Sequence, residues 1–257
     1  MRLVPRLAER GVTVRAVSRK TNFDWARPET FPPAVAGVDA VYLIPPAFIA
    51  DATPMVRPFL VAAKAAGAAR VVVVSSLGVE FPHEPKTSGR IALERCVQDS
   101  GLEWTVLRPG GFAQNFSESF MLPGVRQGTV VSATGTGAVA FIDADNIAAV
   151  AAAALTEPGH ASATYALTGP SALTFSEAVA IISKVSGRPV THRAISGDEF
   201  AAMLAGFGLP PDYAAILVRD QRGIAEGAGA RVSDVVARIT TPITFAQFAE
   251  RAAQSWR

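Results

Sequence analysis

The 257-residue sequence has little of what several protein classes require. Its one cysteine, Cys96, excludes an internal disulfide framework and is typical of a buried thiol in a reducing compartment. Its three histidines, His83, His160 and His192, lack the spacing of a metal site. The longest run rich in alanine and valine, 147–155, is far shorter than the roughly 18 apolar residues of a membrane span. We therefore expect no metal, no membrane span and a cytoplasmic location.

The net charge of the sequence is small, +2 at pH 7. The sequence therefore lacks the strong excess of positive charge that is typical of proteins that bind nucleic acid. The first residues alternate between charged and apolar types and lack the hydrophobic segment of a signal peptide. Hydrophobic residues make up 49% of the chain, which is enough for one large domain or a domain with a small appendage. A small molecule is the expected partner, and the chain is expected to be a monomer or a homodimer.

Strand and helix patterns alternate over the first 155 residues, which predicts an α/β fold with a doubly wound parallel sheet. The run Arg70-Val-Val-Val-Val74 is apolar on both faces, as in an interior parallel strand. The predicted strands are 12–18, 38–44, 70–74, 103–107 and 138–142, and the predicted helices are 1–10, 29–36, 54–67, 88–100 and 143–155.

The remaining chain is less regular. Strands are predicted at 164–167 and 189–195, and helices at 175–186, 198–206, 212–226 and 244–255. We therefore expect a Rossmann-like core over residues 1–155. A small α/β substrate-capping lobe is expected over residues 156–257, interleaved with the last sheet strand and ending in the terminal helix.

The helix pattern at 1–10 has no strand before it. In a dinucleotide-binding fold, a central strand and a glycine-rich turn precede this helix. The turn lets backbone N–H groups approach the pyrophosphate at the positive end of the helix dipole. A missing central strand would leave buried backbone groups unpaired, at about 1–3 kcal/mol each. The sheet is therefore expected to lack its first strand, through a truncated or misassigned start or with another element filling the gap.

Six short sequence segments form, by their order and spacing, a pattern typical of one protein family. They are Phe23-Asp-Trp25, Gly37-Val-Asp-Ala-Val-Tyr-Leu-Ile-Pro-Pro46, Val72-Val-Val-Ser-Ser-Leu-Gly78, Ser100-Gly-Leu-Glu-Trp-Thr-Val-Leu-Arg-Pro-Gly-Gly-Phe-Ala-Gln-Asn115, Phe141-Ile-Asp-Ala-Asp-Asn-Ile147 and Thr244-Phe-Ala-Gln-Phe248. Together they resemble the NmrA-like branch of the atypical short-chain dehydrogenases, and within it the festuclavine dehydrogenase-like reductases and the small quinone reductases. The resemblance implies a Rossmann core, bound NAD(P)H and a small hydrophobic substrate.

The triplet Ser18-Arg19-Lys20 follows the predicted strand 12–18. An acidic residue at this point would bind the ribose 2′-hydroxyl, whereas arginine accommodates a 2′-phosphate. The triplet therefore favours NADPH over NADH, and an exposed basic turn is the alternative. The resemblance places Asp24 and Trp25 beside the adenine, although Trp25 fits core packing equally well.

Further cofactor contacts are expected where the strands end, because ligands bind at the carboxyl edge of open α/β sheets. Prolines after a strand and a serine that caps its end are also ordinary structural features. The contacts that the resemblance implies come from Ile44, Pro45, Pro46, Ser75, Pro109, Gly110, Gly111 and Phe112.

The Tyr-x-x-x-Lys pair of ordinary short-chain dehydrogenases is absent, and Lys86 and Arg90 occupy its aligned positions. Neither can deliver a proton as a tyrosine with a lowered pKa does. NmrA-like proteins often lack the pair, and hydride transfer to an activated acceptor needs less acid catalysis. The candidate catalytic groups are Ser76, Lys86 and Asn115, with Phe112 and Phe116 in the pocket. Asp143 is expected to cap a helix.

Three functions are compatible with these residues. The leading prediction is an NAD(P)H-dependent reductase, with NADPH preferred, that acts on a small apolar acceptor of the quinone, enone or imine type, in secondary metabolism. One alternative is a cofactor-independent, redox-neutral enzyme, an isomerase or cyclase, which uses the same pocket. The other is a non-catalytic regulatory protein that senses NAD(P). NADPH binding is expected if the missing strand and turn are restored, and the chain as written favours the cofactor-free alternative.

Overall fold

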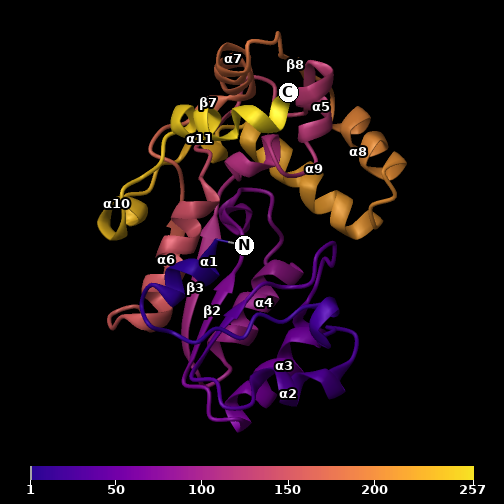
Figure 1. Ribbon diagram of the computed structural model, residues 1–257. Coiled ribbons are helices and arrows are strands. Elements are labelled where there is room, and N and C mark those ends of the chain that lie inside the picture. The colour runs from indigo at the N-terminus through magenta and orange to yellow at the C-terminus, as the bar shows by residue number, and fades with distance from the viewer. Residues whose placement is uncertain (1) are drawn as a thin grey trace. The chain divides into compact units, whose positions relative to one another are not determined.

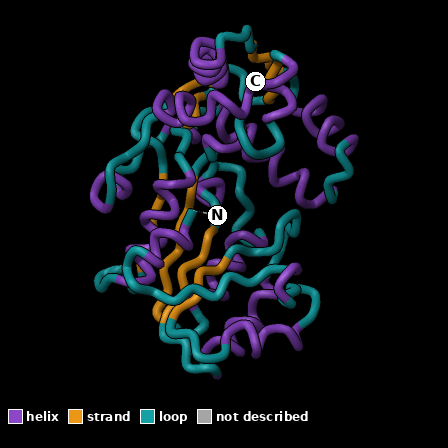
Figure 2. The backbone as a smooth tube through the Cα atoms, in the orientation of Figure 1, coloured by secondary structure: helices purple, strands orange, loops and turns teal. Residues whose placement is uncertain are grey.

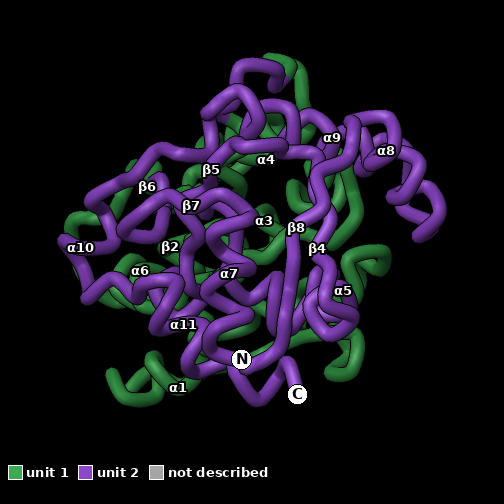
Figure 3. Tube along the Cα trace, turned by 90° about the horizontal axis from the view of Figure 1, so that it is seen from above, with its two compact units in different colours: residues 1–79, 85–108, 148–165 green, residues 80–84, 109–147, 166–257 purple. Residues whose placement is uncertain are grey.

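The computed structural model describes residues 2–257 of the chain (Figure 1). It divides into two compact units, each built from segments that are far apart in the sequence (Figure 3). Unit 1 comprises residues 1–79, 85–108 and 148–165, and unit 2 comprises residues 80–84, 109–147 and 166–257. The division into a cofactor core and a substrate lobe stays a prediction.

A parallel sheet forms the centre of unit 1 (Figure 2). Its strand order is β1-β2-β3-β6, with β1 at Ala40–Leu43, β2 at Arg70–Val74, β3 at Glu103–Pro109 and β6 at Ala163–Leu167. Strands β1, β2 and β3 pair in parallel, with Arg70 opposite both Ala40 and Glu103. The middle valines of β2 are completely buried, as expected for an interior strand. The predicted α/β fold with a Rossmann-like parallel sheet is confirmed.

Helices and an aromatic cluster complete the core of unit 1. Trp25 packs edge-to-face against Phe23 and Phe59, with ring centroids 5.0 and 5.2 Å apart, so Trp25 contributes to core packing. Cys96 is buried in the same core, and its burial raises the pKa of the thiol. The helices of this part of the chain are α1 (Leu3–Ala8), α2 (Phe31–Val35), α3 (Thr53–Ala65), α4 (Gly89–Gln98) and α6 (Ala144–Thr156).

Residues 12–18 form no strand in the structure, so the strand predicted there is wrong. Apart from the partly buried Val14, their side chains are exposed. The segment is held by Arg15, whose guanidinium donates to the carbonyl oxygens of Ala34 (3.2 Å) and Ala36 (2.7 Å) at the end of α2. A strand satisfies its backbone groups only beside another strand, and in the described sheet β1 is an edge strand that pairs with β2 alone.

Unit 2 contains two small sheets and most of the remaining helices. Strand β4 (Thr129–Ser132) runs parallel to β8 (Thr191–Ala194), and β5 (Ala138–Val139) runs antiparallel to β7 (Leu173–Thr174). The strand predicted at 138–142 is therefore reduced to two residues. The helices are α5 (Leu122–Gln127), α7 (Phe175–Ser186), α8 (Gly197–Gly206), α9 (Pro211–Ala225), α10 (Val235–Ile239) and α11 (Phe245–Ala252).

Aromatic packing and helix caps organise unit 2. Phe116 is buried among Phe141, Phe175 and Phe245, and its carbonyl oxygen accepts a hydrogen bond of 2.8 Å from the indole of Trp256. As predicted, Asp143 caps α6: its Oδ1 accepts a hydrogen bond of 2.7 Å from the backbone N–H of Asp145. Its Oδ2 lies 2.5 Å from the Arg251 guanidinium.

Within residues 2–257, none of the helices combines the length and the apolar character needed to cross a membrane. The same residues contain no cluster of three or more histidine, cysteine, aspartate or glutamate side chains that could hold a metal ion.

Candidate functional site

The carboxyl ends of β1 and β2 lie at the same edge of the parallel sheet, where ligands bind in open α/β folds. Ile44, Pro45 and Pro46 follow β1, and Ser75 and Ser76 follow β2. The structure thus brings together the predicted cofactor and catalytic residues that end these two strands.

A buried ion pair holds the ends of β2 and β3. Arg108 donates from Nε to Oε1 of Glu94 (2.9 Å) and from Nη2 to Oε2 (2.5 Å). The Ser75 hydroxyl donates to the same Oε1 at 2.5 Å. Glu94 is 3% exposed, and a buried carboxylate requires this degree of pairing. The hydroxyl proton of Ser75, a predicted cofactor contact, is thus already donated to Glu94.

Ser76 has a different environment. Its Oγ accepts a hydrogen bond of 3.1 Å from the backbone N–H of Gly78 and lies 3.4 Å from Nη1 of Arg90. Both contacts use the oxygen as an acceptor, so the hydroxyl proton can be donated to a ligand. The serine and the guanidinium together form a pair of donors suited to an oxygen or nitrogen with a lone pair.

The other two candidate catalytic residues belong to other segments of the chain. Lys86 is exposed in the loop that precedes α4, in unit 1. Asn115 is partly buried in unit 2, and its backbone N–H donates to the carbonyl oxygen of Phe112 at 3.1 Å. Phe116, predicted as a pocket residue, is completely buried in the core of unit 2. Of the three candidate catalytic residues, Ser76 is thus the one with a polar side-chain partner, Arg90, at the sheet edge.

The segment 109–112 is tied into unit 2 by its backbone. Pro109 is buried, the N–H of Gly110 donates to the carbonyl oxygen of Leu167 (2.9 Å), and the carbonyl oxygen of Gly111 accepts from Ile142 (2.9 Å). A Cβ on Gly111 would lie 2.9 Å from the Val139 side chain, so close packing explains this glycine. Phe112 is partly buried and forms a parallel bridge with Ile142.

The basic triplet forms a short, capped turn. The Ser18 side chain accepts a hydrogen bond of 3.3 Å from the backbone N–H of Lys20, and Thr21 Oγ1 accepts one of 2.6 Å from that of Ser18. Arg19 and Lys20 are exposed on this turn. Two adjacent cations on a fixed turn fit a phosphate monoester. The Asp24 carboxylate accepts from the N–H of Ala26 at 3.0 Å and so stabilises the following bend.

These donors fit the 2′-phosphate end of NADPH. The fit to the cofactor rests on the Arg19–Lys20 turn and on the sheet edge.

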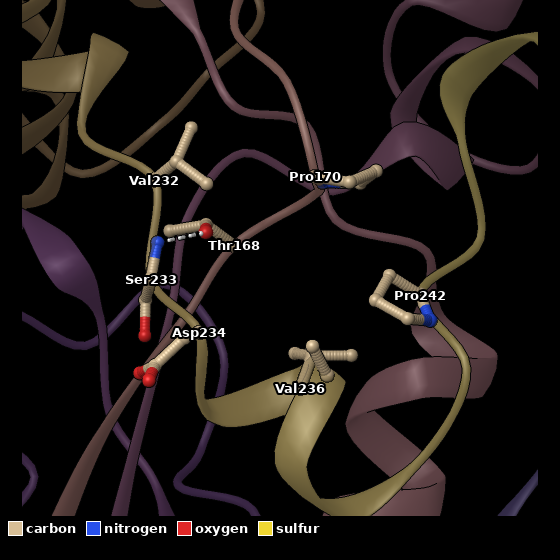
Figure 4. Close-up of a pocket in the computed structure, with 8 residues that line it drawn as sticks. Thr168, Pro170, Val232, Ser233, Asp234, Val236 and Pro242 are labelled. Atoms are coloured by element: carbon tan, nitrogen blue, oxygen red, sulfur yellow. Dashed lines mark hydrogen bonds between the residues drawn. The ribbon is translucent and has the colours of Figure 1, made fainter.

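A separate cavity of about 290 Å³ lies in unit 2 (Figure 4). The Thr168 hydroxyl oxygen, which lines it, accepts a hydrogen bond of 2.8 Å from the backbone N–H of Ser233, so this N–H is not free for a ligand there. None of the predicted site residues lines it, and no motif in the sequence marks it. Its lining consists of Thr168, Pro170, Val232, Ser233, Asp234, Val236, Ala237 and Pro242.

Sequence reasoning missed Glu94, although the sequence contains a signal for it. Leu93, Cys96 and Val97 are buried on one face of α4, and Glu94 shares that face. A carboxylate among apolar positions of an amphipathic helix indicates a buried partner. The partner, Arg108, is 14 residues away and could not be identified from the helix alone.

Comparisons with known proteins agree with the motif pattern. The model of the NmrA-like family matches residues 2–237. The chain is 37% identical over 267 residues to the uncharacterized oxidoreductase YesF of Bacillus subtilis (strain 168), covering 99% of this chain and 92% of that protein. It is 36% identical to the NAD(P)H azoreductase of Xenophilus azovorans, covering 88% and 80%.

Solved structures extend the likeness to the fold. The NADPH-dependent quinone oxidoreductase QOR2 of Escherichia coli, complexed with NADPH, superposes with a TM-score of 0.76 at 29% identity, covering 96% of this chain and 86% of that one. The triphenylmethane reductase of Citrobacter sp., complexed with NADP(H), gives a TM-score of 0.74 at 25% identity, covering 97% and 87%. With a family match over most of its length and relatives above 30% identity, the chain belongs to the NmrA-like family.

Proposed function

We propose that the protein is an NADPH-dependent reductase of small apolar acceptors of the quinone or azo type. The observation that carries this proposal is the likeness, over 96% of the chain, to a quinone oxidoreductase complexed with NADPH. The exposed Arg19–Lys20 turn supports the choice of NADPH over NADH. The azoreductase relative supports the acceptor class. A cytoplasmic location belongs to the same proposal.

In this proposal NADPH supplies a hydride, and one proton from solvent completes the two-electron reduction of a quinone to a hydroquinone. Arg19 and Lys20 bind the 2′-phosphate. Ser76 and Arg90 donate hydrogen bonds to the acceptor oxygen as negative charge develops on it. Such preorganised donors replace the tyrosine of ordinary short-chain dehydrogenases, because a quinone is already activated. The Glu94–Arg108 pair keeps the strand ends in place.

Titration of the purified protein with NADPH and NADH, followed by nicotinamide fluorescence, tests cofactor binding. We expect saturable binding that is at least about tenfold tighter for NADPH. Oxidation of bound NADPH is then followed with a quinone, an azo dye, an enone and an imine, and we expect turnover to be fastest with the first two. No binding at millimolar cofactor would contradict the proposal. Saturable binding without oxidation of any acceptor would instead favour a sensor.

A further inference from the structure

An apolar patch follows β1 at the carboxyl edge of the sheet. It consists of Ile44, Phe48 and Ile49, which are 62%, 55% and 38% exposed. All three belong to unit 1 and lie within six residues of Leu43, the last residue of β1. Large apolar side chains gathered at a ligand-binding edge indicate a contact surface.

The backbone of Phe48 is in the left-handed region, with φ of +63°. A bulky side chain rarely adopts this conformation, because its Cβ approaches the backbone too closely. Phe48 is 55% exposed, so burial of the side chain does not account for this conformation. Strained residues that persist are concentrated at ligand-binding positions. The conformation and the exposure of Phe48 are therefore those of a ligand-binding position.

Close packing holds this loop against the start of α4, which in turn contacts Ser76. Gly89, the first residue of α4, contacts the backbone of Ala50 and Asp51 so closely that a Cβ there would lie 2.5 Å from the Cα of Asp51. The next residue of α4, Arg90, extends to within 3.4 Å of Ser76 Oγ. The patch, the start of α4 and the serine are thus joined within unit 1.

We propose that Phe48, with Ile44 and Ile49, binds the aromatic ring of the acceptor while Ser76 and Arg90 bind its reducible oxygen or nitrogen. This inference rests on the proposed function and specifies its substrate class as planar aromatic compounds with a lone pair on the reacting atom. An aromatic ring gains both apolar contact and favourable ring geometry against Phe48. An aliphatic enone can still accept hydrogen bonds from Ser76 and Arg90, but it has no aromatic ring to pack against Phe48.

The test is the variant Phe48→Asn, because asparagine tolerates the left-handed conformation and removes the ring. Val61→Asn is the matched control: Val61 is 65% exposed on α3 in the same unit. For each protein, calorimetry without cofactor would give the dissociation constant of a naphthoquinone, and fluorescence would give that of NADPH. Steady-state kinetics would then be measured with the same naphthoquinone and with an aliphatic cyclic enone.

We expect Phe48→Asn to weaken naphthoquinone binding about fivefold and to raise the Michaelis constant for this acceptor by the same factor. NADPH binding, the kinetics with the aliphatic enone and every constant of Val61→Asn should stay within about twofold of the parent protein. Unchanged naphthoquinone binding by a folded Phe48→Asn protein would overturn the inference. Naphthoquinone binding that depends on Phe48 in a protein that turns over no acceptor would support the inference and contradict the reductase proposal.

Discussion

Arg108 at the end of β3 and Glu94 on α4 form a two-point ion pair in which the carboxylate is almost completely buried. The Ser75 hydroxyl adds a third hydrogen bond to this carboxylate, so one acidic side chain joins the ends of two neighbouring strands. A pair of this kind contributes little by its presence, but breaking it leaves an uncompensated buried charge. The geometry of the sheet edge therefore depends on Glu94.

Replacing Glu94 with glutamine should destabilise the protein by about 3 kcal/mol, because an amide donor then faces the Arg108 guanidinium. Urea unfolding of the parent and Glu94→Gln proteins measures this difference. The exposed pair between Arg27 and Glu29 provides the matched control, and Glu29→Gln should leave the unfolding midpoint unchanged. Equal midpoints for Glu94→Gln and the parent protein would show that the buried pair is dispensable.

The double variant Arg19→Ala/Lys20→Ala should bind NADPH at least about tenfold more weakly, with little change for NADH, because the two side chains contact the 2′-phosphate in the proposed function. Fluorescence titration with both cofactors checks the ratio. Arg6→Ala, which removes another positive charge of unit 1, controls for net charge. If the double variant lost affinity for NADPH and for NADH by the same factor, the two side chains would not contact the 2′-phosphate.

Asp143→Ala should lower the free energy of unfolding by about 1 kcal/mol, because α6 loses its cap. Asp143→Asn should cost less, since its side-chain oxygen still accepts from the Asp145 N–H. Arg251 is half exposed, so the lost ion pair adds little. Asp234→Ala is a suitable comparison, because Asp234 precedes α10 without making a side-chain cap, and its stability should match the parent. Thermal unfolding of the four proteins would decide between these outcomes.

The stabilisation from Glu226 should depend on pH. Hydrogen bonds from Arg222 (3.0 Å) and His83 (2.5 Å) lower the pKa of its carboxyl group. A carboxyl with a lowered pKa stabilises the folded state above its unfolded pKa, and this contribution is lost as the pH falls through the folded value. Glu226→Gln should therefore unfold more easily than the parent near neutral pH and equally in strong acid. A difference that persisted in acid would show that charge is not the cause.

Local signals predicted much of the fold. Helix α7 was predicted with its observed bounds, because Thr174 and Glu177 form a capping box and Gly187 ends the helix with positive φ. The interior strand β2 followed from its β-branched run. Both features depend on neighbouring residues alone, which is why sequence patterns suffice for them.

Features that depend on distant residues could not be predicted in this way. Residues 12–18 have the composition of a strand, but a strand forms only where another strand lies alongside it. The positions of the strand ends followed from the predicted topology. The bond of Ser75 to Glu94 did not, because it joins residues that are 19 positions apart, and no local pattern marks the positive φ of Phe48.

Cys96 is 4% exposed in the core that α3 and α4 share, and its burial raises the pKa of the thiol. A thiol-specific reagent can therefore reach this sulfur only when the core of unit 1 opens. Because the chain has no other cysteine, the modification rate reports a single event. The labelling kinetics of the unaltered protein thus measure how often that core opens, without an introduced probe.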